Sequence, residues 1–413
     1  MVRYEWSVDS EGFDAESLRE DLRKEREEGI SGYYDLPVDA VEISRRAADD
    51  AREIESENGY DTIAVIGIGG SSLGARAIYG LLRHVSPDSR EMVFLDNPDP
   101  MEITSRFSLI DRDRTVFVLV SKSGTTIETI TIFKTLVEHF GIDAGSGDSR
   151  RIVVVTDAGS ALDDFAKHHD LIRYAVPSNV GGRFSVLSAV GVVPLQFAGF
   201  DTLSILRGAG AFLERFFDGG ETHLLQKAFF YASRRLDHPM NILFAYGTVM
   251  EDLTKWYVQL WGESLGKRSR SGERVGLTPL GQIGSLDQHS FLQLLMDGPR
   301  DKTVTFMKIV DFGDMPRIPN ISLKGIESCD FVNGHSFAEL INSQCDATMS
   351  SVREQGIPVD LISMDRVSEA NIGEIVMYYQ ILTSAVGILL DIDTYSQPGV
   401  ERGKKILTEI FGR

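Results

Sequence analysis

Short apolar runs rich in β-branched residues alternate with stretches of helical spacing along most of the chain. Four such runs lie in the first half, at Thr62–Ile66, Met92–Leu95, Thr115–Val120 and Arg151–Val155. Their apolar character is continuous rather than alternating, which is typical of strands that are buried on both faces. Strands of this kind that alternate with helices predict a parallel sheet covered by helices on both sides.

The same order of elements recurs in the second half of the chain. Three further strand patterns lie at Asn241–Tyr246, Thr303–Ile309 and Pro358–Ser363. A long stretch of helical spacing covers 372–389, and glycines gather between the two halves at 199–219. The sequence therefore predicts an α/β fold of two doubly wound domains, each with a central parallel sheet, between a helical leader and a helical C-terminal tail. These four parts span residues 1–55, 56–200, 201–392 and 393–413.

The net charge limits the class of partner. Acidic residues outnumber basic ones by 61 to 42, which gives a formal charge of −19. A field of this sign disfavours binding to nucleic acid and to anionic membranes. The acid excess and the preference for arginine over lysine suggest a halophilic organism, with an ordinary acidic cytosolic protein as an equal alternative. A requirement for potassium chloride would distinguish the two.

The rest of the composition favours a cytoplasmic protein without a structural metal. Cys329 and Cys345 are the only cysteines, which excludes a disulfide framework and leaves no cluster with metal-ligand spacing. The N-terminus has no apolar stretch behind a basic one, so we expect no secretory signal. The most apolar run, 375–390, is interrupted by polar residues such as Gln380 and Ser384, and we expect a buried core helix there.

Two loops between a strand and a helix are candidates to hold a phosphate. Gly67–Gly74 supplies glycines, but Ser72 replaces the third glycine of a dinucleotide-binding fingerprint. Asp96, near the end of the second strand, still leaves a dinucleotide-binding fold as an alternative. Ser121–Thr126 instead offers four hydroxyls and a lysine within one turn. Capping a helix needs only one hydroxyl, so this excess favours a compact terminal phosphate over simple capping.

Candidate acid–base residues follow further along the chain. Glu263 lies near the end of an amphipathic helix beside tryptophan and glycine, where apolar surroundings suit a general base. The alternative is a surface glutamate paired with Lys267 at i,i+4. His289 shares a helical face with leucines, so a core histidine is the simpler interpretation, although Asp287 and Gln288 could orient its ring.

Two cationic residues have open roles. Arg183 follows two glycines, so a tight turn could present its guanidinium to a ligand, or the residue could form a structural ion pair. Lys404 lies at the start of the terminal helix, where a solvated lysine is the simpler interpretation. Residue spacing alone does not decide between these alternatives.

Together these segments resemble the glucose-6-phosphate isomerase family in its short bacterial and archaeal form. The match runs in order from about Thr62 to Lys405. Its six segments are Gly67–Gly74, Ser121–Glu128, Gly181–Ser185, Glu263–Lys267, Gln288–His289 and Gln397–Lys404. The resemblance implies two sugar isomerase (SIS) domains, no cofactor, and a homodimer with its active sites at the subunit interface. It also implies reversible conversion of glucose 6-phosphate to fructose 6-phosphate in glycolysis and gluconeogenesis.

The resemblance further implies a role for each matching residue. Glu263 corresponds to the base that moves a proton between C2 and C1 through a cis-enediol, and Arg183 to the cation that stabilises the enediolate. His289 matches the acid–base group for ring opening, which the partner subunit supplies. Lys404 matches a group that assists ring opening, in a tail that completes the active site. The phosphate cradle and the site lining correspond to Gly70, Ser71, Ser121, Lys122, Ser123, Thr126, Glu128 and Gln397.

Three rival functions remain open. A non-catalytic SIS module would bind a sugar phosphate without needing Glu263, His289 or Lys404. A dinucleotide-dependent dehydrogenase would need the glycine fingerprint that is imperfect here. The sequence only weakly excludes a bifunctional phosphoglucose/phosphomannose isomerase. The second loop reads Ser-Lys-Ser-Gly-Thr-Thr, where many animal members have Thr-Phe in the middle, and this difference bears on the tolerance of mannose 6-phosphate.

Overall fold

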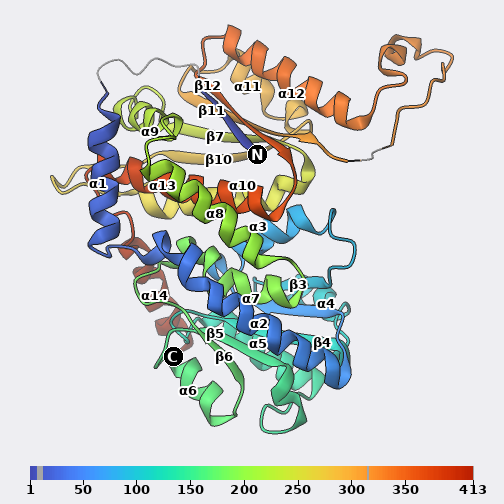
Figure 1. The fold of residues 1–413 in the computed structure, drawn as a ribbon, viewed down its shortest axis with the longest axis vertical. Coiled ribbons are helices and arrows are strands. Elements are labelled where there is room, and N and C mark those ends of the chain that lie inside the picture. The colour runs from blue at the N-terminus through green and yellow to red at the C-terminus, as the bar shows by residue number, and fades with distance from the viewer. Residues whose placement is uncertain (7–12, 314–315, 413) are drawn as a thin grey trace.

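The computed structural model describes residues 1–6, 13–313 and 316–412, and it contains two five-stranded sheets. Helices lie between the sheets and on their outer faces, so the molecule is built in layers (Figure 1). The inner faces of both sheets share one continuous apolar core with the helices between them. Each outer face has a smaller core of its own. The predicted α/β architecture with two doubly wound sheets is confirmed.

The first sheet is parallel throughout, in the order β3-β2-β4-β5-β6. Its strands are β2 (Thr62–Ile66), β3 (Glu91–Leu95), β4 (Thr115–Val120), β5 (Ile152–Thr156) and β6 (Ile172–Ala175). Every residue of β2, β4 and β5 is buried, as their continuous apolar runs predict. The sequence pattern misses β6, because in this short edge strand only Tyr174 is buried.

Helices cover both faces of the first sheet. Those on the inner face are α2 (Leu36–Asn58), α3 (Leu73–Leu82) and α7 (Ala189–Phe197). Those on the outer face are α4 (Pro100–Phe107), α5 (Ile127–Phe140) and α6 (Ala161–His168). α7 is apolar on nearly all sides because it is enclosed between the sheet, α2 and α3.

The second sheet has the order β1-β12-β11-β7-β10, and β1 alone is antiparallel to its neighbour. Its strands are β1 (Val2–Trp6), β7 (Met240–Tyr246), β10 (Thr278–Gly284), β11 (Lys302–Asp311) and β12 (Val359–Arg366). β1 belongs to the segment expected to be a helical leader, so the start of the chain instead completes this sheet. The pattern misses β10 because Pro279 and Gly281 interrupt it, and an edge strand tolerates both.

The helices of the second half also divide between two faces. α8 (Thr202–Phe217), α9 (His223–Ser233), α10 (Glu251–Leu265) and α13 (Glu369–Leu389) lie on the inner face. α11 (Leu292–Asp297) and α12 (Phe337–Glu354) cover the outer face. Among the described helices, only α13 is long and apolar enough by composition to cross a membrane, and 89 % of its apolar window is buried inside the protein. The expected core helix is therefore confirmed.

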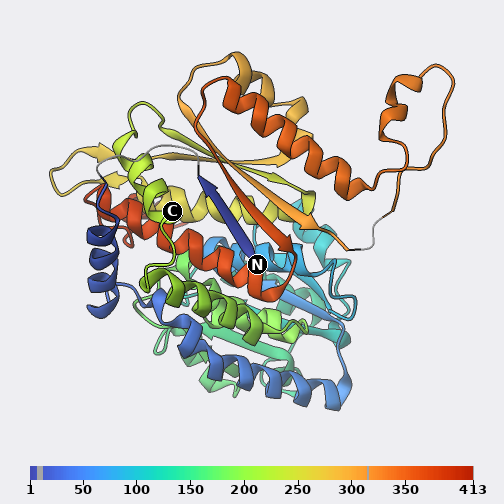
Figure 2. The same cartoon turned by 45° about the horizontal axis from the view of Figure 1, so that its top comes forward.

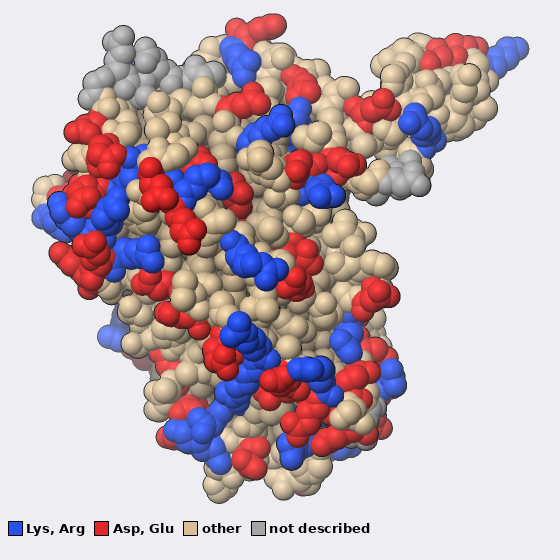
Figure 3. Space-filling view, viewed as in Figure 1, with Lys and Arg blue, Asp and Glu red and all other residues tan. Residues whose placement is uncertain are grey.

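Several parts lie outside the layers. α1 (Ala15–Glu27) packs against α9 and α13, and α14 (Glu401–Phe411) lies close to the C-terminus. A short hairpin, β8 (Lys267–Arg268) and β9 (Arg274–Val275), follows α10. Residues 316–336 form an arm that projects away from the second sheet (Figure 2). Acidic and basic side chains are interspersed over the face in Figure 3 rather than segregated into patches.

Two inner helices approach each other closely enough to give a stability test. A Cβ atom at Gly208 of α8 would lie 2.0 Å from the carbonyl oxygen of Ala370 on α13. We expect Gly208→Ala to lower the free energy of unfolding by about 1–3 kcal/mol, because the two backbones must move apart.

The matched control for this test is Gly210→Ala on the same helix. Its Cβ atom would lie 3.5 Å from Cβ of Pro37, an ordinary contact. Alanine also favours a helix over glycine by about 1 kcal/mol, so the control should be neutral or stabilising. Urea unfolding followed by circular dichroism measures both variants. Equal stability of the two would contradict the packing argument.

Candidate active site

The first sheet reverses its direction of winding between β2 and β4. β2 leads to its neighbour β3 on one side, and the chain then returns to place β4 on the other side. Ligands of such sheets bind where the loops at the carboxyl ends of the two strands diverge. These loops lie in Gly67–Gly74 and Ser121–Thr126, the two segments singled out in the sequence. A Cβ atom at Gly67 would lie 2.9 Å from the carbonyl oxygen of Val120, so the close approach of the two loops requires glycine at position 67.

The helices that follow these two loops have no side-chain caps. Neither Ser72, the N-cap of α3, nor Thr126, the N-cap of α5, caps its helix through a side-chain hydrogen bond. The Thr126 hydroxyl instead accepts a hydrogen bond from Ser121 Oγ at 2.9 Å, and Ser123 Oγ lies 3.5 Å from it. The simple capping interpretation is therefore wrong for this loop. Uncapped N-termini with their positive dipole ends favour an anion at this edge of the sheet.

Lys122 links the second loop to the turn that carries the buried arginine. Its Nζ donates hydrogen bonds to the carbonyl oxygens of Ser178 and Val180, at 2.8 Å each. These acceptors lie in the stretch that precedes Arg183. Because an ammonium group has three N–H donors, these two hydrogen bonds leave room for a third to a phosphate.

The other expected loop residues lie at the same edge of the sheet. A Cβ atom at Gly70 would lie 2.3 Å from the carbonyl carbon of Gly182, so the first loop is in backbone contact with the arginine turn. Ser71 ends a 3-10 turn, and Glu128 lies in the first turn of α5; both side chains are partly buried. Gly70 therefore sets the distance between the first loop and that turn.

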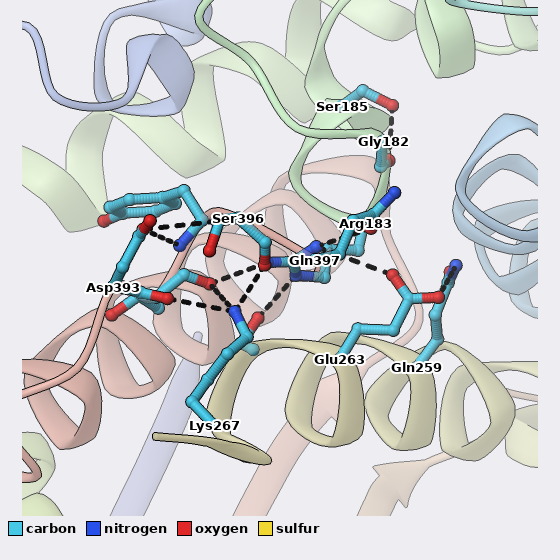
Figure 4. A network of polar contacts seen from close by, with 12 residues as sticks. Gly182, Arg183, Ser185, Gln259, Glu263, Lys267, Asp393, Ser396 and Gln397 are labelled. Carbon is cyan, nitrogen blue, oxygen red and sulfur yellow. Dashed lines mark hydrogen bonds and ion pairs between the residues drawn. The ribbon is translucent and has the colours of Figure 1, made fainter. Parts of the chain in front are cut away.

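Arg183 is only 2 % exposed, and its guanidinium is held by distant parts of the chain (Figure 4). Nε donates to Ser264 Oγ at 2.6 Å, Nη1 to Gln397 Oε1 at 3.0 Å, and Nη2 to the carbonyl oxygen of Thr394 at 2.6 Å. The carboxylate of Glu263 lies 3.5 Å from Nη1. Burial lowers the pKa of Arg183, and the nearby Glu263 partly offsets this shift. The arginine thus anchors the C-terminal segment and also faces a carboxylate.

Glu263 lies on the last turn of α10 with 36 % of its side chain exposed. Its Oε1 accepts a hydrogen bond from Gln259 Nε2 at 3.2 Å, and its Oε2 faces Arg183. The alternative pairing with Lys267 is wrong, because that lysine binds the backbone of the C-terminal segment (Figure 4). A carboxylate that is oriented on both oxygens and still reaches solvent can exchange a proton with a ligand.

Lys267 is a site residue that sequence reasoning did not identify. Its Nζ donates to the carbonyl oxygens of Asp393 and Thr394, at 3.0 and 3.3 Å, and to that of Ser396. Burial, together with repulsion from Arg183, lowers the pKa of Lys267 to about 8. Local spacing predicts a pair with the glutamate four residues earlier, whereas the first of these acceptors lies 126 residues further along the chain.

A pocket of about 790 Å³ opens between α10, the β8–β9 hairpin and the C-terminal segment. Its volume suits a small ligand. Its polar lining includes Glu263, Lys267, Arg268, Arg274, Ser396 and Gln397. Gln259, which sequence reasoning also missed, connects the region of Glu263 to the first loop, because a Cβ atom at Gly69 would lie 3.0 Å from its Nε2. The buried Oε1 of Gln259 has no hydrogen-bond partner within the part of the chain that the structure describes.

His289 is exposed, so the interpretation as a core histidine is wrong. Asp287 and Gln288 do not orient its ring. Asp287 instead accepts hydrogen bonds from the Ile283 N–H and the Ser290 hydroxyl, at 2.7 and 2.6 Å. Gln288 donates to the hydroxyl of a tyrosine on β7 at 2.9 Å. The histidine is not among the residues that line the pocket.

Lys404 also lies outside the pocket of its own chain. It is exposed on α14, a few residues beyond Val400, the last residue of the lining. A single chain therefore brings Arg183, Glu263 and Gln397 together, and neither His289 nor Lys404 is among the residues that line the pocket beside them.

Asp96, the residue that kept a dinucleotide site open, is engaged elsewhere. Arg76 on α3 lies 3.1 Å from its carboxylate and 3.1 Å from that of Asp252. A dinucleotide site would need this carboxylate to hydrogen-bond the ribose. The ion pairs therefore weigh against a dinucleotide-dependent dehydrogenase.

Comparison with known sequences places these features in one family. The sequence profile described as phosphoglucose isomerase matches residues 55–412. The glucose-6-phosphate isomerase of Campylobacter jejuni is 39 % identical over 391 residues, which cover 94 % of each chain. That of Rubrobacter xylanophilus is 35 % identical and covers 88 % of this chain and 85 % of its own.

Solved structures share the fold. A hypothetical protein of Thermus thermophilus superposes with a TM-score of 0.87 at 30 % identity and covers 97 % of this chain and 95 % of its own. A glucose-6-phosphate isomerase of Chlamydia trachomatis reaches 0.80 at 24 % identity, covering 100 % and 88 % of the two chains. A putative phosphosugar isomerase of Clostridium difficile reaches 0.57 at 15 % identity and covers 91 % and 97 %. The last two likenesses concern the fold alone.

The environment of Lys267 gives a pH-dependent prediction. We expect its amine to titrate near pH 8, against an ordinary value of 10.5 in the unfolded chain. Between these values the folded state binds fewer protons than the unfolded state, so this residue makes the protein more stable as the pH rises. Competitive acetylation by acetic anhydride, read by mass spectrometry over the alkaline range, measures the folded value.

Lys255, on α10, is the matched control for the acetylation. Partial burial lowers its pKa, but the hydrogen bond to Glu251 and the charge of Asp252 outweigh burial and raise it. Lys267 should therefore react at a clearly lower pH than Lys255. Identical pH profiles for the two lysines would contradict the structural argument.

Proposed function

The chain belongs to the phosphoglucose isomerase family, and from this premise we propose that it interconverts glucose 6-phosphate and fructose 6-phosphate. The observation that carries the proposal is the approach of a partly exposed carboxylate, Glu263, to the buried guanidinium of Arg183 at 3.5 Å. Two uncapped helix ends in the same molecule support it by offering a phosphate site. Aldose–ketose isomerisation needs these three parts: an anion anchor, a base, and a group that stabilises negative charge.

Glu263 is the base in this proposal. Its carboxylate removes the proton from C2 of the open-chain aldose and returns it to C1 of the resulting cis-enediol. The hydrogen bond from Gln259 and the approach of Arg183 orient its two oxygens. The guanidinium stabilises the negative charge that develops on the enediolate oxygens. Because that cation is already held by Ser264 and Gln397, little reorganisation is needed when the charge appears.

The substrate phosphate binds at the point where the winding of the first sheet reverses. The free N–H groups at the starts of α3 and α5, together with the loop hydroxyls, are suitable donors for its oxygens. The residues that we assign to this cradle are Gly70, Ser71, Ser121, Lys122, Ser123 and Thr126. Glu128 and Gln397 line the rest of the site. Lys122 contributes by holding the second loop against the arginine turn.

Ring opening needs acid–base groups that one chain does not place in the pocket. We assign this step to His289 from a second subunit, assisted by Lys404. Support comes from the exposure of that histidine and from the arm over 316–336, where Phe331 is 80 % and Ile326 is 55 % exposed. Exposed apolar surface of this kind is typical of subunit contacts. The working enzyme is therefore proposed to be a homodimer.

The cellular setting is also a proposal. The two cysteines are free thiols, as suits the reducing cytoplasm in which glycolysis and gluconeogenesis operate. The charge of −19 supports the further proposal of a high-salt organism. Unfolding midpoints that do not change with potassium chloride would contradict it.

The first test is catalytic. We expect a coupled assay to detect conversion of fructose 6-phosphate, and Glu263→Gln to lower kcat by about 10²- to 10⁴-fold, because an amide cannot accept the C2 proton. The matched control is Glu251→Gln on the same helix, where Glu251 pairs with Lys255 at the surface, and it should keep its activity.

An equally active Glu263→Gln would show that this residue is not the base. An inactive wild type would refute the isomerase, and turnover of mannose 6-phosphate would indicate the bifunctional alternative.

The second test asks whether the site is shared between chains. Glu263→Gln and His289→Ala should each be inactive as homodimers. Mixing them through a denaturation and refolding cycle should restore about a quarter of the wild-type activity, because half of the dimers are mixed and each then has one intact site. No recovery, with mixed dimers verified by mass spectrometry, would place His289 outside the partner's site.

A further inference from the structure

The C-terminal segment over 393–397 forms one wall of the pocket and is held there by two cations (Figure 4). Nη2 of Arg183 donates to the carbonyl oxygens of Thr394 and Ser396, at 2.6 and 3.2 Å. Lys267 binds the same two carbonyl oxygens. The position of these acceptors therefore sets the position of the guanidinium.

Tyr395, which lies between Thr394 and Ser396, reaches into a largely buried polar group that we call the tyrosine cluster. Its members are Glu25, Tyr33, Tyr34, Ser384 and Tyr395. The Ser384 hydroxyl lies 2.8 Å from the hydroxyl of Tyr395 and 2.9 Å from that of Tyr33. The rings of both tyrosines pack on Phe184, with centroid distances of 5.2 and 5.0 Å. The cluster thus joins the C-terminal segment to α13 and to the residue that follows Arg183.

Glu25 of α1 is the acceptor at the centre of the tyrosine cluster. Its Oε1 accepts a hydrogen bond from Tyr34 at 2.8 Å and another from Tyr395. Burial raises the pKa of Glu25, while the two phenolic hydrogen bonds oppose the rise. The Glu25 side chain is half-buried, so these two phenolic hydrogen bonds replace part of its hydration.

α13 extends the same support to the arginine turn. Gln380, one turn before Ser384, donates from Nε2 to the carbonyl oxygen of Phe184 at 2.8 Å. These are two of the polar residues that interrupt the most apolar run of the sequence, and both are fully buried. Gln380 thus bonds to the residue that follows Arg183, and Ser384 bonds to Tyr395 as well as to Tyr33. The helix α13 therefore orients both the turn that carries Arg183 and the C-terminal segment.

We propose that Glu25 is a positioning residue, which through Tyr395 fixes the segment 393–397 so that its carbonyl oxygens and Gln397 hold Arg183 in place. The inference rests on the proposed function, because the benefit is the alignment of the guanidinium with the enediolate. Glu25 is not among the residues that line the pocket. Its loss should act on kcat more than on KM, since Arg183 stabilises charge that develops in the transition state.

The test compares two disruptive variants with two matched controls. Tyr395→Phe and Glu25→Leu each remove the hydrogen bond that fixes the segment. Glu25→Gln keeps an oxygen that can accept from Tyr395 and should rescue the leucine variant. Tyr33→Phe removes a buried phenol of the same cluster that bonds to Ser384 rather than to Glu25. It therefore controls for the loss of a buried hydroxyl.

We expect the two disruptive variants to lower kcat about tenfold with KM changed by less than about twofold. The amides of 393–397 should exchange their hydrogens faster in both variants, while the two controls stay near wild type. Faster exchange with unchanged kcat would make the cluster purely structural and overturn the inference. An equal loss of kcat in Tyr33→Phe would also overturn it.

The two proposals fail in different ways. If the wild-type protein isomerises no sugar phosphate, the proposed function fails without any of these variants. Hydrogen exchange then decides by itself whether Glu25 fixes the segment. Unchanged exchange in Tyr395→Phe and Glu25→Leu would overturn that part.

Discussion

The guanidinium of Arg183 is removed from water almost completely, and the arrangement of the site follows from the need to satisfy it. A buried charge is costly unless other groups replace its hydration. Ser264 at the end of α10, and Gln397 and two carbonyl oxygens of the C-terminal segment, provide these groups. The carboxylate of Glu263 stays 3.5 Å away and partly exposed. The positive charge is therefore held in place but not neutralised by a tight ion pair.

The same reasoning explains how a protein of charge −19 can offer a site to an anion. Surface charges are screened over about 8–10 Å at ordinary ionic strength, whereas a bound ligand interacts with groups in direct contact. At the reversal point of the first sheet these groups are backbone N–H donors and hydroxyls. They need no net positive charge, only helix ends without side-chain caps. The acidic exterior and the proposed anion site are therefore compatible.

The core helix α13 has a role beyond stability. Most of its residues are apolar and buried, but its buried polar residues Gln380 and Ser384 bond to groups beside the site. Hydrogen bonds made by buried polar groups specify one arrangement of the elements around them. Because α13 is packed in the shared core, its hydrogen bonds fix the positions of Phe184 and Tyr395. The close contact between α13 and α8 at Gly208 fixes the position of α13 itself.

The sequence by itself determined the strands with continuous apolar runs, both loops of the proposed phosphate site and the ordered motifs, because these depend on local periodicity and residue type. It did not reveal the edge strands β6 and β10, whose patterns are weakened by exposure, proline and glycine. Only the tertiary structure decided that Arg183 meets Gln397 across 214 residues and that Lys267 turns away from Glu263. It alone placed His289 at the surface. The physical reason is that hydrogen-bond partners are chosen by proximity in the folded chain, which residue spacing does not contain.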